Sequence, residues 1–418
     1  MIDKRLICLQ QLIESYQNSQ YDPTEDGPRY ILKMMRKEYE YNKSLEEIKW
    51  IYLKVCGNNF RETCYRLRDR EIPSLCASLL NVPVINSLDL RYNELTNEGA
   101  ITLGNFLKND RCLKELNLMG NNITADGAKE LGIALKLNHT LKILKMTGNP
   151  IKREGGIHLA HGLQANNTLT HLDVGECDMD IASAIAFATV LRTNNSLLCF
   201  NINRLLLFTH QEEQTVHMWE MLCLNTTLTE LHLAKCDMRD FGAKRLVDAL
   251  ERNKTIQVLD VSANRISSDG AIAFARALRN RCSLTVLDLS FNRIQNEGAI
   301  ALAEVLKKHN DRLIVLALAS NEIHEKGLCA LADALLDNDH LRYIYLWGND
   351  ISDKAAAAWG HLQTIGRLRE DSTDLRPYKV DGVVKMAMLN NDCDYRRYRF
   401  AVPWWGPQAP EDRSVALF

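Results

Sequence analysis

The residues of this chain that could do covalent or metal chemistry do not fall at the spacings which that chemistry needs. His158 and His161 lie three residues apart on an expected helix, but no acidic residue or thiol has metal-ligand spacing to them, so we interpret them as a surface pair. The chain has no Cys-x-x-Cys pair, no glycine-rich phosphate loop and no Gly-x-Ser-x-Gly motif. We therefore expect no enzyme activity, no cofactor and no bound metal.

Composition narrows the class of protein further. The 418 residues carry 51 Lys and Arg against 53 Asp and Glu, a formal charge of −2, which argues against a dedicated nucleic-acid binder. Twelve scattered cysteines are typical of a reducing compartment. The N-terminus has no long apolar core, and no stretch has the length of a membrane span. We expect an intracellular protein with no nucleic-acid or membrane partner.

One phrase recurs along the chain with a period of 28 residues. It has the form Leu-x-Leu-x-x-Asn-x-Leu, first clearly at Leu88 to Leu95 and again at Leu116 to Ile123. Later copies begin at Leu144, Leu172, Phe200, Leu231, Leu259, Leu287, Leu316 and Ile344, and a degenerate copy begins at Leu53. A period of this size is the signature of a solenoid. We count about eleven units between residues 45 and 366.

Each part of the unit predicts one local structure. Leu-x-Leu alternates with period two and predicts a short strand, and leucines at helical spacing predict a following helix. The Asn or Cys is expected to hydrogen-bond backbone groups left free as the chain leaves the strand, and a Gly six residues later lets the helix begin close to the turn. Recurrent Asn-x-Thr/Ser triplets, such as Asn166 to Thr168, are interpreted as helix-to-strand turns.

The expected architecture follows from the spacing of these elements. Strands joined through helices must run parallel. Strands in a sheet lie about 4.8 Å apart, whereas packed helices need roughly 8–10 Å, so stacking the units bends the array. We expect an α/β solenoid, a horseshoe with a parallel sheet on the concave face and helices on the convex face.

The composite pattern resembles a known family. Leu-x-x-Leu-x-Leu-x-x-[Asn/Cys]-x-Leu, followed by Gly-Ala and a helix, is similar to the ribonuclease-inhibitor-like class of leucine-rich repeats over about residues 45–365. The resemblance implies protein partners. It also suggests a cytoplasmic assembly, with the axoneme of a cilium or sperm flagellum as one setting and the nucleus as another.

The two ends of the chain are not repeats. Residues 1–44 are expected to form a helical cap that seals the apolar end of the array, and Ser44 to Glu47 resembles a capping box that opens the first unit. Residues 367–418 are expected to hold a hairpin around Asp381-Gly382, paired with the open edge of the last repeat, and then an aromatic and basic tail. The fifth unit also departs from the pattern, because Leu205 replaces its Asn and three extra residues enter.

Candidate binding residues come from two regions. Side chains between and after the two strand leucines are expected to face solvent on the concave side, acidic in the middle and aromatic at the C-terminal end. These candidates are Asp173, Glu176, Asp260, Asp288, Tyr343, Tyr345 and Trp347. The tail adds residues of the types that dominate interface hot spots. They are Tyr395, Arg396, Arg397, Tyr398, Arg399, Trp404 and Trp405.

These observations support two hypotheses of function. The first is a non-catalytic protein-interaction scaffold that forms part of a larger complex. The alternative is a regulator or inhibitor of an enzyme, since the resembled class includes ribonuclease inhibitor and an activator of a small GTPase. Against that alternative, the chain lacks the many repeated cysteines of the former and the long acidic run of the latter. For the tail, docking on another protein and folding back on the array stay open.

Overall fold

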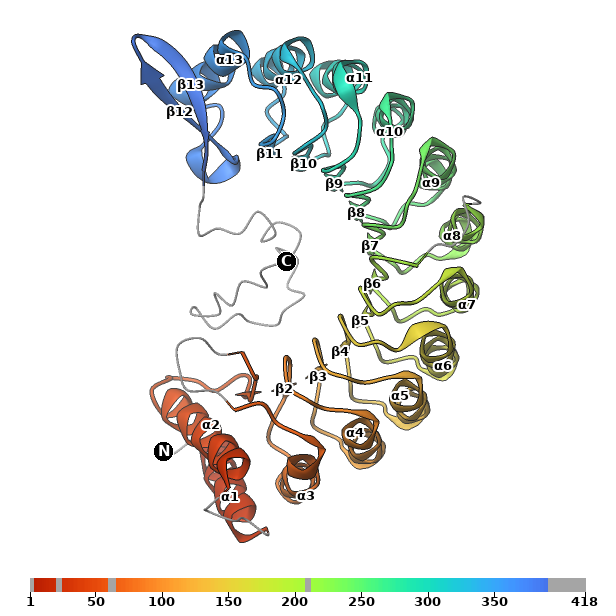
Figure 1. The fold of residues 1–418 in the computed structure, drawn as a ribbon, viewed down its shortest axis with the longest axis vertical. Coiled ribbons are helices and arrows are strands. Elements are labelled where there is room, and N and C mark those ends of the chain that lie inside the picture. The colour runs from red at the N-terminus through yellow and green to blue at the C-terminus, as the bar shows by residue number, and fades with distance from the viewer. Residues whose placement is uncertain (1–3, 20–24, 59–64, 207–211, 390–418) are drawn as a thin grey trace. The chain divides into compact units, whose positions relative to one another are not determined.

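A computed structural model describes residues 4–19, 25–58, 65–206 and 212–389, which fall in two compact units, 1–206 and 207–418. Within each unit, short parallel strands form one layer and helices form a second (Figure 1). The predicted α/β solenoid of alternating strands and helices is therefore confirmed. None of the helices in the described part of the chain combines the length and apolar character that a membrane crossing requires.

The first unit opens with two helices before the repeats. α1 (Lys4–Asn18) and α2 (Asp26–Lys43) pack on each other, and α1 also packs on α3 (Ile72–Asn81). The buried side chains of α1 include Leu9, Leu12 and Tyr16, whose spacing of three and four residues places them on one face. These helices cover the side of the unit that begins with β1 (Tyr52–Lys54).

Ser44 does not open a helix, so the predicted capping box is wrong. Its hydroxyl donates to the Tyr41 carbonyl oxygen at 2.7 Å and helps to end α2, and residues 44–51 form no helix. A serine side chain can satisfy a free carbonyl at a helix C-terminus as well as a free N–H at an N-terminus. The Ser-x-x-Glu pattern alone does not distinguish these two uses.

The repeats then alternate strand and helix. In the first unit the remaining elements are β2 (Ser87–Asp89), α4 (Asn97–Asn109), β3 (Glu115–Asn117), α5 (Ala125–Leu137), β4 (Ile143–Lys145), α6 (Lys152–Ala165), β5 (His171–Asp173), α7 (Ile181–Leu191) and β6 (Cys199–Asn201), with a 3-10 turn at Asp69–Glu71. In the second unit they are α8 (Glu213–Leu224), β7 (Glu230–His232), α9 (Asp240–Arg252), β8 (Val258–Asp260), α10 (Ser268–Arg279), β9 (Val286–Asp288), α11 (Gln295–Lys308), β10 (Val315–Ala317), α12 (Glu325–Asp337), β11 (Tyr343–Tyr345) and α13 (Asp353–Thr364).

Strand register follows the repeat. Equivalent leucines stand side by side, as in Leu88 with Leu116 and Leu259 with Leu287, and all four are buried. The degenerate first copy obeys the same register, because Leu53 pairs with Leu88. A one-residue slip would exchange the two faces of a strand, so this buried column specifies the pairing.

The ladder asparagines bridge consecutive repeats, as predicted. The side-chain amide of Asn121 donates to the Leu90 carbonyl of the preceding repeat at 3.0 Å and to Leu118 of its own repeat at 2.9 Å, and its oxygen accepts from the Leu95 N–H. Cys177 replaces Asn in one repeat and donates its thiol to the Met146 carbonyl at 3.2 Å. Burial raises the pKa of the Cys177 thiol, so the donor proton is retained.

A second ladder caps the helices. Asn97, in the first turn of α4, accepts from the N–H groups of Thr124 and Gly127 at the start of α5, at 2.9 and 3.1 Å. Asp240 of α9 does the same for Ser267 and Gly270 at the start of α10. In these helices, free N–H groups of the first turn are thus satisfied by a side chain of the preceding repeat. A Cβ on Gly127 would lie 2.8 Å from the Asn97 side-chain oxygen, which explains the glycine.

A third buried asparagine closes each helix-to-strand turn. Asn253 accepts from the N–H groups of Thr255 and Ile256, both at 2.9 Å, and donates to the Leu222 carbonyl of the preceding repeat at 2.8 Å. Four more triplet asparagines act in the same way: Asn138, Asn166, Asn194 and Asn225. The interpretation of the Asn-x-Thr/Ser triplets as turns is confirmed.

The end of the second unit differs from the prediction. β12 (Leu375–Val380) and β13 (Val383–Met388) form the expected hairpin around Asp381-Gly382, but this hairpin is a separate two-stranded sheet that packs on α13. The edge of β11 is instead met by the segment before the hairpin, where the Asp374 carboxylate accepts from the N–H groups of Leu346 and Trp347 at 2.8 and 3.0 Å. One buried carboxylate satisfies two edge donors, so no further strand is needed there.

The ladder predicts a large stability loss on truncation. Replacing Asn121 by Ala removes its bonds to Leu90, Leu118 and Leu95 and leaves those buried groups without partners, so the free energy of unfolding should fall by about 2–4 kcal/mol. Urea unfolding of the full chain measures this loss. Asn109→Ala, at an exposed helix end, is the control and should change stability by less than about 1 kcal/mol. Equal effects of the two substitutions would contradict the role of the ladder.

Candidate functional site

The acidic candidates on the strands are buried, so their expected exposure to solvent is wrong. Asp173 in the first unit and Asp260 and Asp288 in the second are at most 4% exposed. Each carboxylate accepts the backbone N–H two residues further on, from Gly175, Ser262 and Ser290 respectively, at 2.9–3.1 Å. These bonds close the turn that leaves each strand. The same position is filled elsewhere by Asp89, Asn117 and Asn201, with the same bond.

Neighbouring strands also neutralise one another. In the first unit Lys145 lies 2.5 Å from the carboxylate of Glu115 on the adjacent strand, and both side chains are buried. Glu115 stands opposite Ile143 and Lys145 opposite Asn117, so the two charges form a diagonal pair across adjacent strands, which a lysine side chain is long enough to bridge. Lys145 and Glu115 therefore neutralise each other between two strands of the first unit. Glu176 follows Asp173 in the same turn and is half-buried, with a left-handed backbone.

The strongest electrostatic cluster lies in the second unit. His232 Nε2 is 2.6 Å from Glu230 and Nδ1 is 3.4 Å from Asp260 on the next strand, and all three side chains are buried. Burial by itself lowers the pKa of His232, but the hydrogen bonds to Asp260 and Glu230 outweigh it and raise that pKa to about 9. The imidazole is therefore a cation at neutral pH and balances part of the acidic row.

The aromatic candidates belong partly to an apolar cluster. Tyr345 is buried with Val315 and Ala317, and Tyr343 and Val286 pack against them. Trp347 is half-buried, and its backbone N–H donates to the Asp374 carboxylate. The structure thus brings Tyr343, Tyr345 and Trp347 together at one end of the second unit, and binding of a partner there stays a prediction. The candidates Tyr395, Arg396, Arg397, Tyr398, Arg399, Trp404 and Trp405 lie outside the described residues.

The histidine pair on α6 has the environment of a surface pair. His158 is half-buried, His161 is exposed, and the ammonium of Lys136 lies 3.3 Å from a ring nitrogen of His161.

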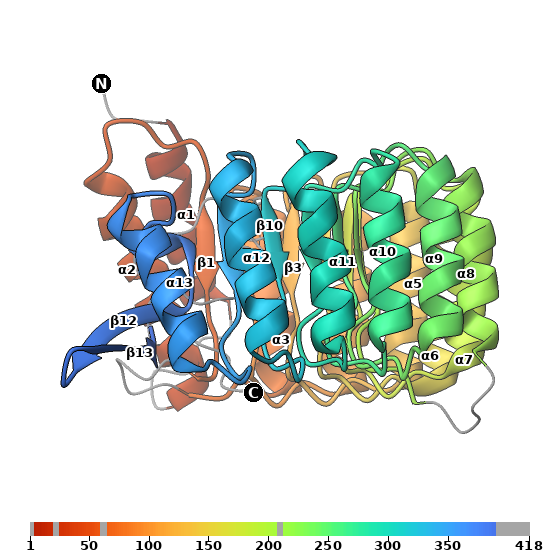
Figure 2. The same cartoon turned by 90° about the horizontal axis from the view of Figure 1, so that it is seen from above.

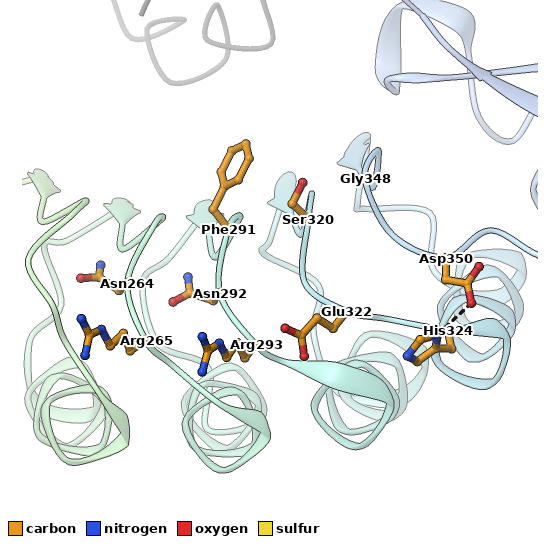
Figure 3. A pocket seen from close by; sticks show the side chains of 10 residues that line it. All are labelled: Asn264, Arg265, Phe291, Asn292, Arg293, Ser320, Glu322, His324, Gly348 and Asp350. Atoms are coloured by element: carbon orange, nitrogen blue, oxygen red, sulfur yellow. Dashed lines mark hydrogen bonds and ion pairs between the residues drawn. The ribbon is translucent and has the colours of Figure 1, made fainter.

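A polar hollow opens in the second unit beside the turns that follow the strands. Arg265 and Arg293 stand side by side, Glu322 lies next along the row, and His324 contacts Asp350 at 2.9 Å (Figure 3). Arg265 is paired with Asp237, whereas Arg293 makes no ion pair within the described ranges. The hollow is lined by Asn264, Arg265, Phe291, Asn292, Arg293, Ser320, Glu322, His324, Gly348 and Asp350.

Phe291 stands on the rim of this hollow in an unfavourable backbone conformation. Its φ is +58° and its side chain is 52% exposed (Figure 3). The equivalent residues of the unit are Lys235, Ala263, Ser320 and Gly348, which share the left-handed φ. A left-handed residue other than glycine costs roughly 1–2 kcal/mol, and a bulky one is rare there. The fold itself gains little from a half-exposed phenylalanine at this position.

Sequence reasoning missed two of these features, although both left a signal. The His232 cluster could have been found by placing Glu230-x-His232 beside Asp260, which follows His232 by one repeat period. The residue before the ladder Asn or Cys has a positive φ in the repeats from Tyr92 onward, and we call these residues the left-handed row. Glycine at this place in three repeats, as Gly120, Gly148 and Gly348, indicates that backbone conformation. Phe291 is the aromatic member of this row in the second unit, as Tyr92 is in the first.

Comparison with known proteins agrees with the geometry. Seven segments match the leucine rich repeat family, at residues 83–104, 109–132, 137–160, 165–188, 224–247, 252–275 and 281–303. The chain is 43% identical over 206 residues to leucine-rich repeat-containing protein 34 of Mus musculus, which covers 49% of each. It is 44% identical over 198 residues to the Homo sapiens protein of that name, covering 47% of this chain and 43% of the relative. The alignments thus span about half the length of these curated relatives.

Two solved structures also resemble the chain. One is the yeast complex of Rad7 and Elc1, with 15% identity, a TM-score of 0.46, and coverage of 86% of this chain and 91% of the other. The second is the tropomodulin C-terminal domain of Caenorhabditis elegans, with 16% identity, a TM-score of 0.31, and coverage of 45% and 99%.

The His232 cluster predicts a loss of stability in alkali. The folded pKa of about 9 exceeds the ordinary value of 6.5, so the stabilisation is complete below about pH 6.5 and disappears as the pH rises through 9. Urea unfolding measures the free energy of unfolding at pH 6.5 and at pH 9.5. Between these two pH values, the wild-type chain should lose up to about 3 kcal/mol more of this free energy than the His232→Gln variant loses. His161→Gln, at an exposed position, should keep the wild-type pH dependence. An identical pH dependence for His232→Gln and wild type would argue against a charged His232.

Proposed function

We propose, from the premise that this chain is a leucine-rich repeat protein, that it is a non-catalytic scaffold which binds other proteins within a larger assembly. Each repeat contacts its neighbours, so the array offers a long, regular surface on which several partners can be held. The setting we propose is the cytoplasm, with the axoneme of a cilium or sperm flagellum first and the nucleus second, as the sequence resemblance suggested.

Phe291 is the observation that carries this proposal. Strained backbone that gives no packing benefit tends to mark a functional position. A half-exposed aromatic ring and the guanidinium of Arg293, which has no ion pair within the described ranges, both line the hollow, and both residue types are enriched in protein interfaces. The rim also has polar neighbours that can hydrogen-bond a partner, such as Ser320 and Glu322.

This proposal is tested by replacing Phe291 with glycine, the residue found at the same repeat position as Gly348. Phe291→Gly relieves the left-handed strain, so stability should be unchanged or raised by up to about 1 kcal/mol, while binding through the ring is lost. Proximity labelling with the full chain in ciliated cells measures the proteins in reach. We expect that at least one protein which wild type labels above the background of an untethered labelling enzyme will be labelled only at that background level by Phe291→Gly.

Ala263→Gly is the matched control, because Ala263 holds the same left-handed place one repeat earlier and carries only a methyl side chain, which is half-buried. It should relieve strain without changing the labelled set. A wild-type set no richer than that of the untethered enzyme would refute the scaffold. A set that is the same in wild type and Phe291→Gly would remove Phe291 from the binding surface.

A further inference from the structure

One helix of the second unit breaks a rule that the others obey. In each helix from α9 to α13, the residue five places after the small residue of the first turn is also small and buried: Val247, Ala275, Ala303, Ala332 and Gly360. The equivalent residue of α8 is Trp219, which is only half-buried. Its indole N–H is buried and has no acceptor among the residues described, so the fold gains no hydrogen bond from a tryptophan here.

The Trp219 ring is covered by cations of the neighbouring helix. α8 and α9 pack side by side in the helix layer (Figure 2). The guanidinium carbon of Arg245 lies 5.7 Å from the Trp219 ring centre and 5.4 Å from that of Phe241, and that of Arg252 lies 5.8 Å from Trp219. Phe241 is 53% exposed. We call these four residues the Trp219 patch.

The two guanidiniums are not neutralised by the carboxylates of their own helix. Asp240 caps α10, and Asp248 and Glu251 both bind Arg276 of α10, at 2.7 and 3.1 Å. Arg245 and Arg252 make no ion pair in the part of the chain that the structure describes; Arg252 reaches only the thiol of Cys223. A cation–π contact attracts a guanidinium to a ring without placing its N–H donors on a carboxylate, so donors of Arg245 and Arg252 stay available to an acidic partner.

We propose that the Trp219 patch binds an acidic segment of a partner protein that carries an apolar side chain. The open N–H donors of Arg245 and Arg252 match carboxylates in geometry and charge, and the exposed ring of Phe241 offers apolar contact. A protein segment fits better than nucleic acid, because only two cations are present, Asp248 and Glu251 lie on the same helix, and the chain as a whole carries −2. The inference rests on the scaffold function but uses a surface separate from Phe291.

A photo-crosslinker at Phe241 can identify what occupies the patch. The full chain with p-benzoylphenylalanine at position 241 is irradiated in cells, and the attached peptide is sequenced by mass spectrometry. We expect a peptide from another protein with an excess of Asp and Glu and an apolar residue near the attachment point. The same crosslinker at Ile272, an exposed site on α10, should not capture that peptide.

Three variants separate recognition from folding. Trp219→Ala installs the residue type found at this place in α10, α11 and α12, so it should keep the unfolding midpoint while cutting the cross-link yield about tenfold. Arg245→Glu with Arg252→Glu should abolish the cross-link, and Arg245→Lys with Arg252→Lys should give an intermediate yield, because lysine keeps the charge without the stacked fork.

Several outcomes would overturn the inference. They are a captured peptide that is neutral or basic, capture of nucleic acid or of a second copy of this chain, and an undiminished yield in the charge-reversed variant. If Phe291→Gly still removes labelled proteins in any of these cases, the scaffold function stands and only the Trp219 patch is refuted.

Discussion

The constraint on which this structure depends is the need to satisfy backbone groups that a single repeat cannot satisfy alone. A three-residue strand followed at once by a turn leaves carbonyl and N–H groups inside the protein with no partner in their own repeat. Buried or half-buried side chains bridge the gap at three places: the ladder position, as in Asn121; the helix N-terminus, as in Asn97; and the helix-to-strand turn, as in Asn253. Each bridge joins a repeat to the one before or after it, so the repeats depend on one another for stability.

This constraint also determines which polar residues are left for partners. Asp260 and Asp288 have the composition of a binding groove, yet each closes a turn, and His232 balances part of their charge. These charged side chains of the strand layer therefore bind other groups of the same layer. Residues that the fold does not need are found elsewhere in the second unit, on the turn rim at Phe291 and on the helix layer at Trp219. Phe291 and Trp219 are aromatic, whereas the residues at the same repeat positions elsewhere in the second unit are not.

Much of the fold could be predicted because every repeat restates it. The leucine pairs, the ladder asparagines and the first-turn glycines each predicted an element or a contact that the structure contains. Predictions failed where burial decides the outcome, as for Asp260 on its strand, and where a residue had no repeated counterpart. Ser44 ends a helix instead of opening one, and Asp374 rather than the hairpin meets the last strand, since single side chains can serve several local roles. Composition alone could not reveal either choice.

By itself the sequence determined the architecture, because a period of 28 residues with one hydrophobic pattern has a single way to bury its leucines. It also determined that the turns are built on asparagine. Only the tertiary structure decided which side chains are available to partners. Residues about one repeat apart in sequence lie on strands about 4.8 Å apart in space. Lys145 and His232 therefore form ion pairs with residues 30 and 28 positions away in the chain. The left-handed strain at Phe291 and the stacked arginines over Trp219 arise from the same three-dimensional juxtaposition.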